Sequence, residues 1–322
     1  MRQITLMENY LLIARLMLKT YHPKNVKQNK PMNIVYFGSS PFSIFVLNEL
    51  KSAGIVPALI VTTPPRPQGR KLVVTPTPVK EWADTYGIPT LEPEKIRTPE
   101  FEEQIRAKMP ESGWDVFIVA SYGKIIPENI LYLPSHKTLN VHPSLLPLLR
   151  GPAPIEYSIL LDMKDTGVSI MRLDKEMDHG PIIAQEKIIP SSWPLDRITF
   201  EKELGQFGGQ PLARVLPLWI AGTISEREQD HNKATFTKKI SKEEALLDFT
   251  APARINLLKI KAYTGWPKAI FFDEHKDPSG VIKKTRIVVT NATINEKNEL
   301  TLLSVIPEGK KEISWSNYIS HK

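Results

Sequence analysis

Residues 33–54 read NIVYFGSSPFSIFVLNELKSAG, and this stretch decides the fold class. The apolar run at 33–38 is typical of a short strand buried on both faces of a parallel sheet. Ser40 is a residue type that caps helix N-termini, Pro41 suits a first helical turn, and Gly54 suits a helix end. The stretch therefore predicts a strand, a tight turn and a helix, which is the repeating unit of an α/β fold.

The same pattern continues as far as residue 222. Further strands are predicted at 55–63, 114–123, 137–144 and 166–174. Further helices are predicted at 77–87, 98–108, 154–161 and 199–220. Strands that alternate with helices in this way predict an open, mostly parallel α/β sheet.

From about residue 235 the pattern changes to short β-type runs separated by polar turns, as in RIVVTNATI and ELTLLSVI. We therefore predict a catalytic domain at 32–222, a linker at 223–234 and a smaller strand-rich domain at 235–322. Charge follows the same division, because residues 32–231 carry a net −4 and residues 232–322 a net +6. A basic C-terminal part favours a polyanionic partner, and a soluble basic domain without such a partner is an equal alternative.

Residues 1–31 are basic and contain a single acidic residue, Glu8. Their composition is that of a mitochondrial transit peptide, but an upstream start is an equal alternative because Met32 opens the first strand. We treat them as an N-terminal extension and predict a cytoplasmic protein, or a mitochondrial matrix protein if the extension is a transit peptide. The sequence contains no run of about 18 apolar residues, so no membrane span is predicted.

Several chemistries are disfavoured by the motifs that the chain lacks. Its 322 residues include no cysteine, which excludes disulfides and thiolate nucleophiles. The first strand is followed by Gly38 alone, without G-x-G-x-x-G, and no G-x-x-x-x-G-K-[ST] loop is present. The seven histidines form no H-E-x-x-H pattern, so no metal site is predicted.

The strand at 137–144 carries two polar side chains, Asn140 and His142. Because side chains alternate along a strand, both project to one face, near the carboxyl edge where α/β sheets bind ligands. An amide and an imidazole that reach one carbonyl suit acyl transfer. Asp178 lies in a turn after the next strand, and we expect it at the same edge beside the imidazole, with His142 and Asp178 accessible to solvent. Without further context, turn and capping roles for these residues are the simpler alternative.

The motif N-V-H-P-S-L-L-P-x-x-R-G-x-A-P-I at 140–155, with TGVSIMRLDKEMDHGPII at 166–183, resembles the formyltetrahydrofolate-dependent formyltransferases. The resemblance implies a Rossmann-like catalytic domain, and 10-formyltetrahydrofolate as co-substrate without a metal. It implies that Asn140, His142 and Asp178 carry the reaction.

The resemblance also implies two cofactor-binding segments. One is the serine-leucine-leucine-proline tract, and the other is the loop in VASYGKIIP at 119–127 that lines the pterin pocket. The implied cofactor-binding residues are Ser144, Leu145, Leu146, Pro147, Ser121, Tyr122 and Gly123.

Members of this family act on an aminoacyl-tRNA, a purine-pathway amine or an amino sugar. Residues 62–72, TTPPRPQGRKL, resemble the loop that contacts the tRNA acceptor stem, which implies tRNA contacts by Arg66, Arg70 and Lys71. The resemblance extends to about residue 320 and implies a C-terminal OB-like β-barrel that binds tRNA. We therefore expect a monomer that formylates the α-amine of initiator methionyl-tRNA. An amino-sugar N-formyltransferase and an inert folate or tRNA binder are the alternatives.

The sequence departs from the family pattern at three places. GRKLVV at 69–74 lacks a further Gly and Lys before its Lys-Leu pair, which puts one acceptor-stem contact in doubt. His179 and Pro181 stand where tRNA-acting members commonly have Thr and Asp. The C-terminal domain is short between its strands, which puts closure of the barrel in doubt.

Overall fold

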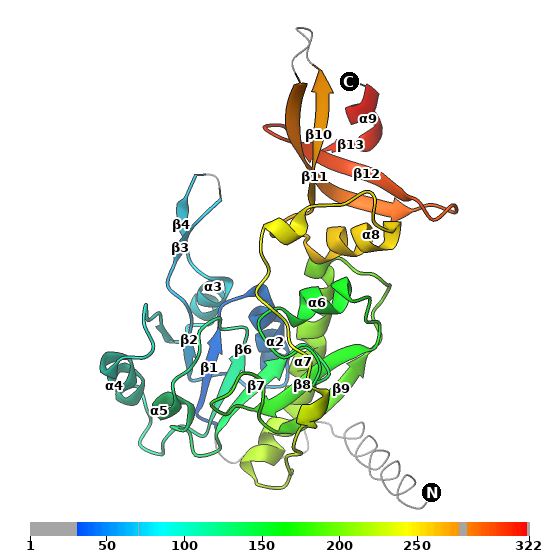
Figure 1. Ribbon diagram of the computed structural model, residues 1–322. Helices are drawn as coiled ribbons and strands as arrows, with labels where there is room; N and C mark the ends of the chain where they lie inside the picture. Colours follow the sequence, from blue (N-terminus) through cyan, green and yellow to red (C-terminus); the bar gives the residue numbers. More distant parts are fainter. Residues whose placement is uncertain (1–30, 70, 277–281, 321–322) are drawn as a thin grey trace, which may run out of the picture.

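A computed structural model describes residues 31–69, 71–276 and 282–320 (Figure 1). The N-terminal extension up to residue 30 and Arg70 lie outside the described residues. Within the described ranges, none of the helices combines the length and apolar content that a membrane span requires.

A seven-stranded sheet with the strand order β5-β2-β1-β6-β7-β8-β9 forms the larger part of the molecule. The first five strands in this order are parallel, and β8 and β9 are antiparallel to their neighbours. The predicted mostly parallel sheet is therefore confirmed. The strands are β1 (Ile34–Gly38), β2 (Leu59–Val61), β5 (Thr90–Leu91), β6 (Val116–Ala120), β7 (Thr138–His142), β8 (Thr166–Arg172) and β9 (Ile182–Ile188).

Helices cover both faces of this sheet, as expected because β1, β2 and β6 are apolar and buried along their whole length. Alternation along β1 places Ile34 and Tyr36 in the core of one face and Val35 and Phe37 in that of the other. On the first face lie α2 (Pro41–Ser52), α3 (Pro78–Thr85), α6 (Pro154–Leu160) and α7 (Arg197–Ile220). On the second lie α4 (Pro99–Ala107) and the short α5 (Glu128–Leu131).

The loop expected at 62–72 contains paired strands in the structure. Strands β3 (Arg66–Gln68) and β4 (Val73–Thr75) pair as an antiparallel hairpin, which projects from the body of the molecule in Figure 1. Pro67 is tolerated because a two-stranded ribbon has free edges, where a missing N–H breaks no ladder bond. Gly69, at φ +68°, adopts the left-handed conformation that the turn requires.

The C-terminal part is confirmed as strand-rich and antiparallel. Its strands β10 (Ile270–Lys276), β11 (Ile282–Ile294), β12 (Leu300–Pro307) and β13 (Ile313–Ser314) pair in this linear order. A separate apolar core joins the sheet to α8 (Ala253–Ala262), and α9 (Trp315–Ser320) follows β13. A linear order leaves β10 and β13 as the two edges of the described sheet, whereas a closed barrel would pair its edge strands.

The segment predicted as a linker, 223–234, lies along the catalytic domain. Arg227 and Ile182 exchange two backbone hydrogen bonds of 2.8 Å. Just beyond the segment, Thr237 N donates to the Arg150 carbonyl at 2.7 Å, and Phe236 forms a parallel bridge with Arg150. These contacts attach residues 227–237 to the larger sheet.

Candidate functional site

Strand β7 places Asn140 and His142 on one face of the sheet, as the alternation predicted. Leu139 and Val141 point to the opposite face, where they join the core under α2 and α7. The expectation of an accessible imidazole is wrong, because His142 is 3% exposed. Asn140 is 8% exposed, and no hydrogen bond engages its side chain within the described part of the chain. Its amide is therefore available to a ligand.

Asp178 reaches His142, but by a different path from the one predicted. Strand β8 runs antiparallel to β7, so its end at Arg172 lies beside Leu139, away from His142. Residues 173–181, the connection to β9, fold back over the second face of the sheet. They bring Asp178 Oδ1 to 3.7 Å from His142 Nδ1, with the aspartate side chain 12% exposed.

A backbone carbonyl determines which imidazole nitrogen faces the site. His142 Nε2 lies 3.0 Å from the Leu149 carbonyl oxygen, which can only accept, so Nε2 carries the hydrogen and donates it. Nδ1 is then the nitrogen that gains or loses a proton, and it faces Asp178. The imidazole is thus a proton acceptor directed at the carboxylate side of the site.

The carboxylate of Asp178 is held by residues 143–153, the ribbon that joins β7 to α6. Gly151 N donates to Asp178 Oδ2 at 2.7 Å, which leaves Oδ1 for His142. Gly151 has φ +112°, and a Cβ there would lie 2.7 Å from the Thr237 carbonyl oxygen. Only glycine fits this position, since any side chain would separate the segment 227–237 from the ribbon.

A polar cluster behind Asp178 has no counterpart in the sequence-based prediction. Gln229 donates to the carbonyl oxygens of Asp178 and Gly180 and accepts from Arg150. Arg150 belongs to the motif quoted above, but no sequence signal pointed to Gln229, which lies in the predicted linker.

A cavity of about 200 Å³ opens beside Asn140 and Asp178. The side chains that line it come from β6, β7, α5, the loop at 124–126 and the connection at 173–178. Its lining residues are Val119, Lys124, Ile125, Ile126, Leu131, Asn140, Leu173, Asp174, Lys175, Glu176, Met177 and Asp178. Six of these twelve residues are apolar and six are polar or charged, a mixture that suits an organic ligand with both apolar and polar parts.

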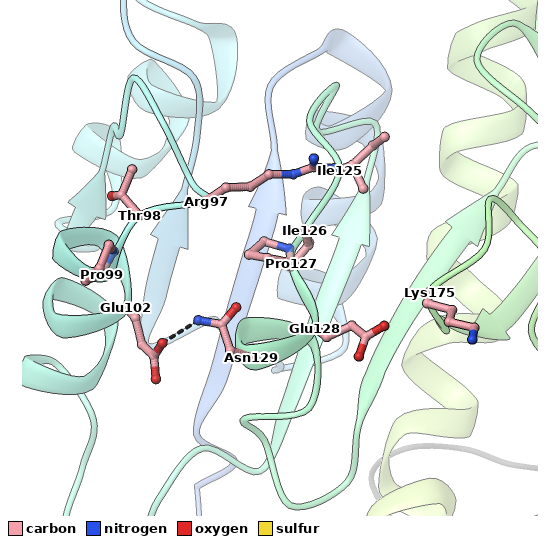
Figure 2. A pocket seen from close by; sticks show the side chains of 10 residues that line it. All are labelled: Arg97, Thr98, Pro99, Glu102, Ile125, Ile126, Pro127, Glu128, Asn129 and Lys175. Carbon is pink, nitrogen blue, oxygen red and sulfur yellow. Dashed lines mark hydrogen bonds between the residues drawn. The ribbon is translucent and has the colours of Figure 1, made fainter.

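A shallower groove shares Ile125, Ile126 and Lys175 with this cavity. Figure 2 shows Lys175 on one side of the groove and Arg97 and Thr98 on the other. Its rim carries acidic as well as basic groups, with Glu102 hydrogen-bonded to Asn129.

The predicted cofactor-binding residues divide into two groups. Ser121 is exposed at φ +51°, and Gly123, at φ +81°, is also exposed on the loop above the cavity. Tyr122 is buried beneath them with its ring 5.5 Å from that of Phe37, and burial raises the pKa of its hydroxyl. The Tyr122 side chain therefore supports the loop from within the core.

The tract from Ser144 to Pro147 is held in place by hydrogen bonds to neighbouring residues. The Ser144 hydroxyl donates to the Leu148 carbonyl at 2.6 Å, and Leu146 N donates to Ser169 Oγ at 3.0 Å. Gln185 donates to the Leu146 carbonyl at 2.8 Å. Ser144 and Leu146 are buried, whereas Leu145 and Pro147 are partly exposed, so only the latter two present side chains to the surface.

Two of the residues predicted to contact tRNA, Arg66 and Lys71, lie on the hairpin β3–β4. Arg66 forms an ion pair of 2.6 Å with Glu94, in which both side chains are more than half exposed, so the pair contributes at most about 1 kcal/mol. Lys71 is exposed at the turn, next to Leu72, Val73 and Val74, which are also exposed. A projecting tip that is basic and apolar can approach a nucleic acid without rearrangement of the core.

Comparisons with known proteins identify the family of the chain. The formyl transferase family matches residues 32–193. A methionyl-tRNA formyltransferase of Chloroflexus aggregans is 43% identical over 242 residues, which are 75% of this chain and 76% of that protein. A methionyl-tRNA formyltransferase of Bacillus subtilis is 35% identical over 303 residues, 89% of this chain and 93% of that protein.

Solved structures share the fold at low identity. Methionyl-tRNA formyltransferase from Clostridium thermocellum aligns with a TM-score of 0.53 and 15% identity, over 88% of this chain and 99% of that chain. HypX from Aquifex aeolicus, in complex with tetrahydrofolic acid, aligns with a TM-score of 0.58 and 14% identity, over 91% and 47%. The sequence relatives, which extend through both parts of the molecule, confirm the resemblance read from the motifs. The chain therefore belongs to the formyl transferase family and, within it, to the methionyl-tRNA formyltransferases.

Proposed function

We propose that this enzyme transfers the formyl group of 10-formyltetrahydrofolate to the α-amine of methionine on initiator tRNA. The observation that carries the proposal is that Asn140 and Asp178 line one cavity, while His142 Nδ1 lies 3.7 Å from the Asp178 carboxylate. Membership of the family supports the acceptor, because the relatives named for methionyl-tRNA match the C-terminal domain as well as the catalytic one.

Asn140 is proposed to stabilise the oxyanion. When the amine attacks the formyl carbon, its carbonyl oxygen gains negative charge and needs a hydrogen-bond donor that is already in position. The Asn140 amide lines the cavity without a partner in the described structure. One such donor typically lowers the barrier by about 3 kcal/mol.

His142 and Asp178 are proposed to move the proton. The attacking nitrogen loses a proton as its bond to the formyl carbon forms, and N10 of the folate gains one as its own bond to that carbon breaks. A single imidazole can accept and return this proton, with no net consumption. The Asp178 carboxylate stabilises the imidazolium that exists between the two transfers, and the distance of 3.7 Å shortens to a hydrogen bond once Nδ1 is protonated.

We further propose that the folate occupies the cavity between the loop at 124–126 and the connection at 173–178. Ser121 and Gly123 would border its entrance, and Tyr122 would support that loop from below. Ser144 and Leu146 would hold the ribbon on which Leu145 and Pro147 face the ligand. The pterin is planar and carries polar edges, and the cavity offers apolar side chains for burial of the ring and polar side chains for its edges.

The tRNA is proposed to contact the hairpin through Arg66, Arg70 and Lys71, and the basic domain at 235–322 through its phosphates. Two separated contact regions suit an elongated polyanion. Each phosphate that a basic side chain neutralises adds to the affinity, and this contribution decreases as the salt concentration rises. We place the enzyme in the cytoplasm, because the methionyl-tRNA formyltransferases that it resembles are bacterial. We expect it to act as a monomer.

Formyl-transfer assays with three acceptors test the proposal. We expect rapid formylation of initiator methionyl-tRNA by 10-formyltetrahydrofolate, and none of uncharged tRNA or of a nucleotide-linked amino sugar. Transfer to the amino sugar with no transfer to methionyl-tRNA contradicts the proposed acceptor. Folate binding without any transfer contradicts the proposed catalytic roles.

A further inference from the structure

The turn that carries Asp178 has a strained backbone. Asp178 has φ +50°, a left-handed conformation that side chains other than glycine rarely adopt. Such a conformation persists where several surrounding contacts hold it, and it is common where a side chain must be presented to a site. Residues 174–180, the Asp178 turn, therefore need contacts from residues outside the turn to hold this conformation. We call these contacts the clamp.

Gln229 provides two hydrogen bonds of this clamp from a single buried amide. Its Nε2 lies 3.0 Å from the Asp178 carbonyl oxygen and 2.6 Å from that of Gly180. Its side chain comes from the segment 223–234, about 50 positions further along the chain, and the residue is 5% exposed. The bonds thus fix the backbone on both sides of the residue after Asp178.

The orientation of this amide follows from the chemistry of its partners. Arg150 Nε and Nη2 lie 3.1 Å and 2.7 Å from Gln229 Oε1, and a guanidinium can only donate. The two carbonyl oxygens on the other side can only accept. Oxygen toward Arg150 and nitrogen toward the turn is the only arrangement that satisfies all four hydrogen bonds.

The Asp178 turn is held by the same cluster at a second point. Arg150 Nη2 donates to His231 Nδ1 at 2.8 Å, and the His231 ring stacks on His179 with centroids 4.1 Å apart and planes 3° from parallel. His179 Nδ1 in turn lies 2.7 Å from Asp174 Oδ2, within the turn itself. Gln229 and His231 therefore join the segment 223–234 to the turn from one side, with Arg150 between them.

We infer that Gln229 is a positioning residue for catalysis, which holds the Asp178 carboxylate at His142 through the backbone of the turn. The inference rests on the proposed function for its kinetic consequence, but its structural consequence is independent of the substrate. Without the two donated bonds, the strained turn relaxes and Asp178 moves relative to Nδ1. A displacement of about 1 Å from a productive geometry costs on the order of 100-fold in rate.

Two variants of Gln229 separate the parts of the clamp. Gln229→Met keeps the length of the side chain and removes all four hydrogen bonds. Gln229→Glu keeps an acceptor for Arg150 and removes only the two bonds donated to the turn. Gln210→Glu, at an exposed position of α7, makes the same chemical change away from the site and is the matched control.

Steady-state and single-turnover kinetics are measured with 10-formyltetrahydrofolate and methionyl-tRNA. We expect kcat to fall about 10- to 100-fold in both Gln229 variants, while KM for each substrate changes less than about threefold. The control retains the wild-type rate. Wild-type kcat in folded Gln229→Glu protein overturns the inference, because the donated bonds are then dispensable.

Combination with Asp178→Asn distinguishes positioning from general destabilisation. If Gln229 acts through Asp178, Gln229→Glu causes less than about a threefold further loss in the Asp178→Asn background. A full additional loss of about 10- to 100-fold in that background contradicts the inference, since it shows an effect that bypasses the carboxylate.

Crystal structures of the wild-type and variant proteins give a readout that needs no acceptor. We expect the separation of Asp178 Oδ1 and His142 Nδ1 to increase by about 1 Å or more in each Gln229 variant that folds. An unchanged turn overturns the inference even if the rate falls. A wild-type enzyme that fails to formylate any charged tRNA contradicts the proposed function alone, and the crystallographic comparison still decides the role of Gln229.

Discussion

The two halves of the catalytic site are built in different ways. Asn140 and His142 lie on β7, a strand whose five residues are all buried and which is hydrogen-bonded on both sides. Asp178 lies on a strained turn that is held by Gly151 and Gln229 from elsewhere in the chain. The strand places its residues by backbone register, whereas the turn depends on individual side-chain and backbone contacts. The position of Asp178 is therefore the more easily altered of the two.

The largest expected effect is on the strand side, from His142→Ala. Loss of the proton carrier should lower the single-turnover rate by about 10⁴-fold. The Leu149 carbonyl also loses its donor in a buried site, so the free energy of unfolding should fall by about 1–3 kcal/mol. Rapid-quench kinetics and urea unfolding measure the two effects. A rate within about tenfold of wild type excludes His142 from the mechanism.

Asp178→Asn should be the next most severe and should leave stability nearly unchanged. The amide oxygen of Asn can still accept from Gly151, so the turn keeps its anchor while the negative charge beside His142 is lost. We expect the single-turnover rate to fall by about 10²- to 10³-fold with a wild-type unfolding midpoint. A large loss of stability would instead show that the charge maintains the fold of the turn.

Gly151→Ala tests the turn side without removing any catalytic group. The new Cβ would lie 2.7 Å from the Thr237 carbonyl oxygen, so the backbone must shift and the bond to Asp178 Oδ2 must weaken. A rate about 10- to 100-fold lower is expected, with KM for the folate near wild type. Gly222→Ala is the control, because it also has positive φ but has open space around it. Equal rates in both variants would show that the Gly151 anchor is dispensable.

The smallest effect is expected from Arg70→Ala, a substitution outside the described residues. Loss of one phosphate contact should weaken tRNA binding a few-fold and flatten the log–log salt dependence of the affinity by about one unit. Folate binding should not change. Arg66→Ala serves as a comparison, since Arg66 already forms an ion pair with Glu94. Superimposable salt curves for wild type and Arg70→Ala would show that Arg70 makes no phosphate contact.

The prediction of the fold succeeded where short-range rules operate. Thr77, Thr98 and Asp196 cap α3, α4 and α7 with their side-chain oxygens, so these helices begin within a few residues of where the sequence placed them. The hairpin β3–β4 and the strand β9 were not predicted. Each of these strands forms by pairing with another strand, and none has an apolar pattern long enough to predict a strand from sequence.

What the sequence determined by itself is the part of the site that lies on one strand. Alternation along 137–144 puts Asn140 and His142 on one face, because the side-chain period of a strand is local and needs no information from elsewhere. The tertiary structure alone decided how Asp178 arrives, which imidazole nitrogen faces it, and that Gln229 clamps its turn. Each of these depends on the antiparallel direction of β8 or on contacts between residues far apart in the chain. Such contacts form only when distant segments of the chain come together in the folded protein. Side-chain alternation and helix capping are local signals and do not predict them.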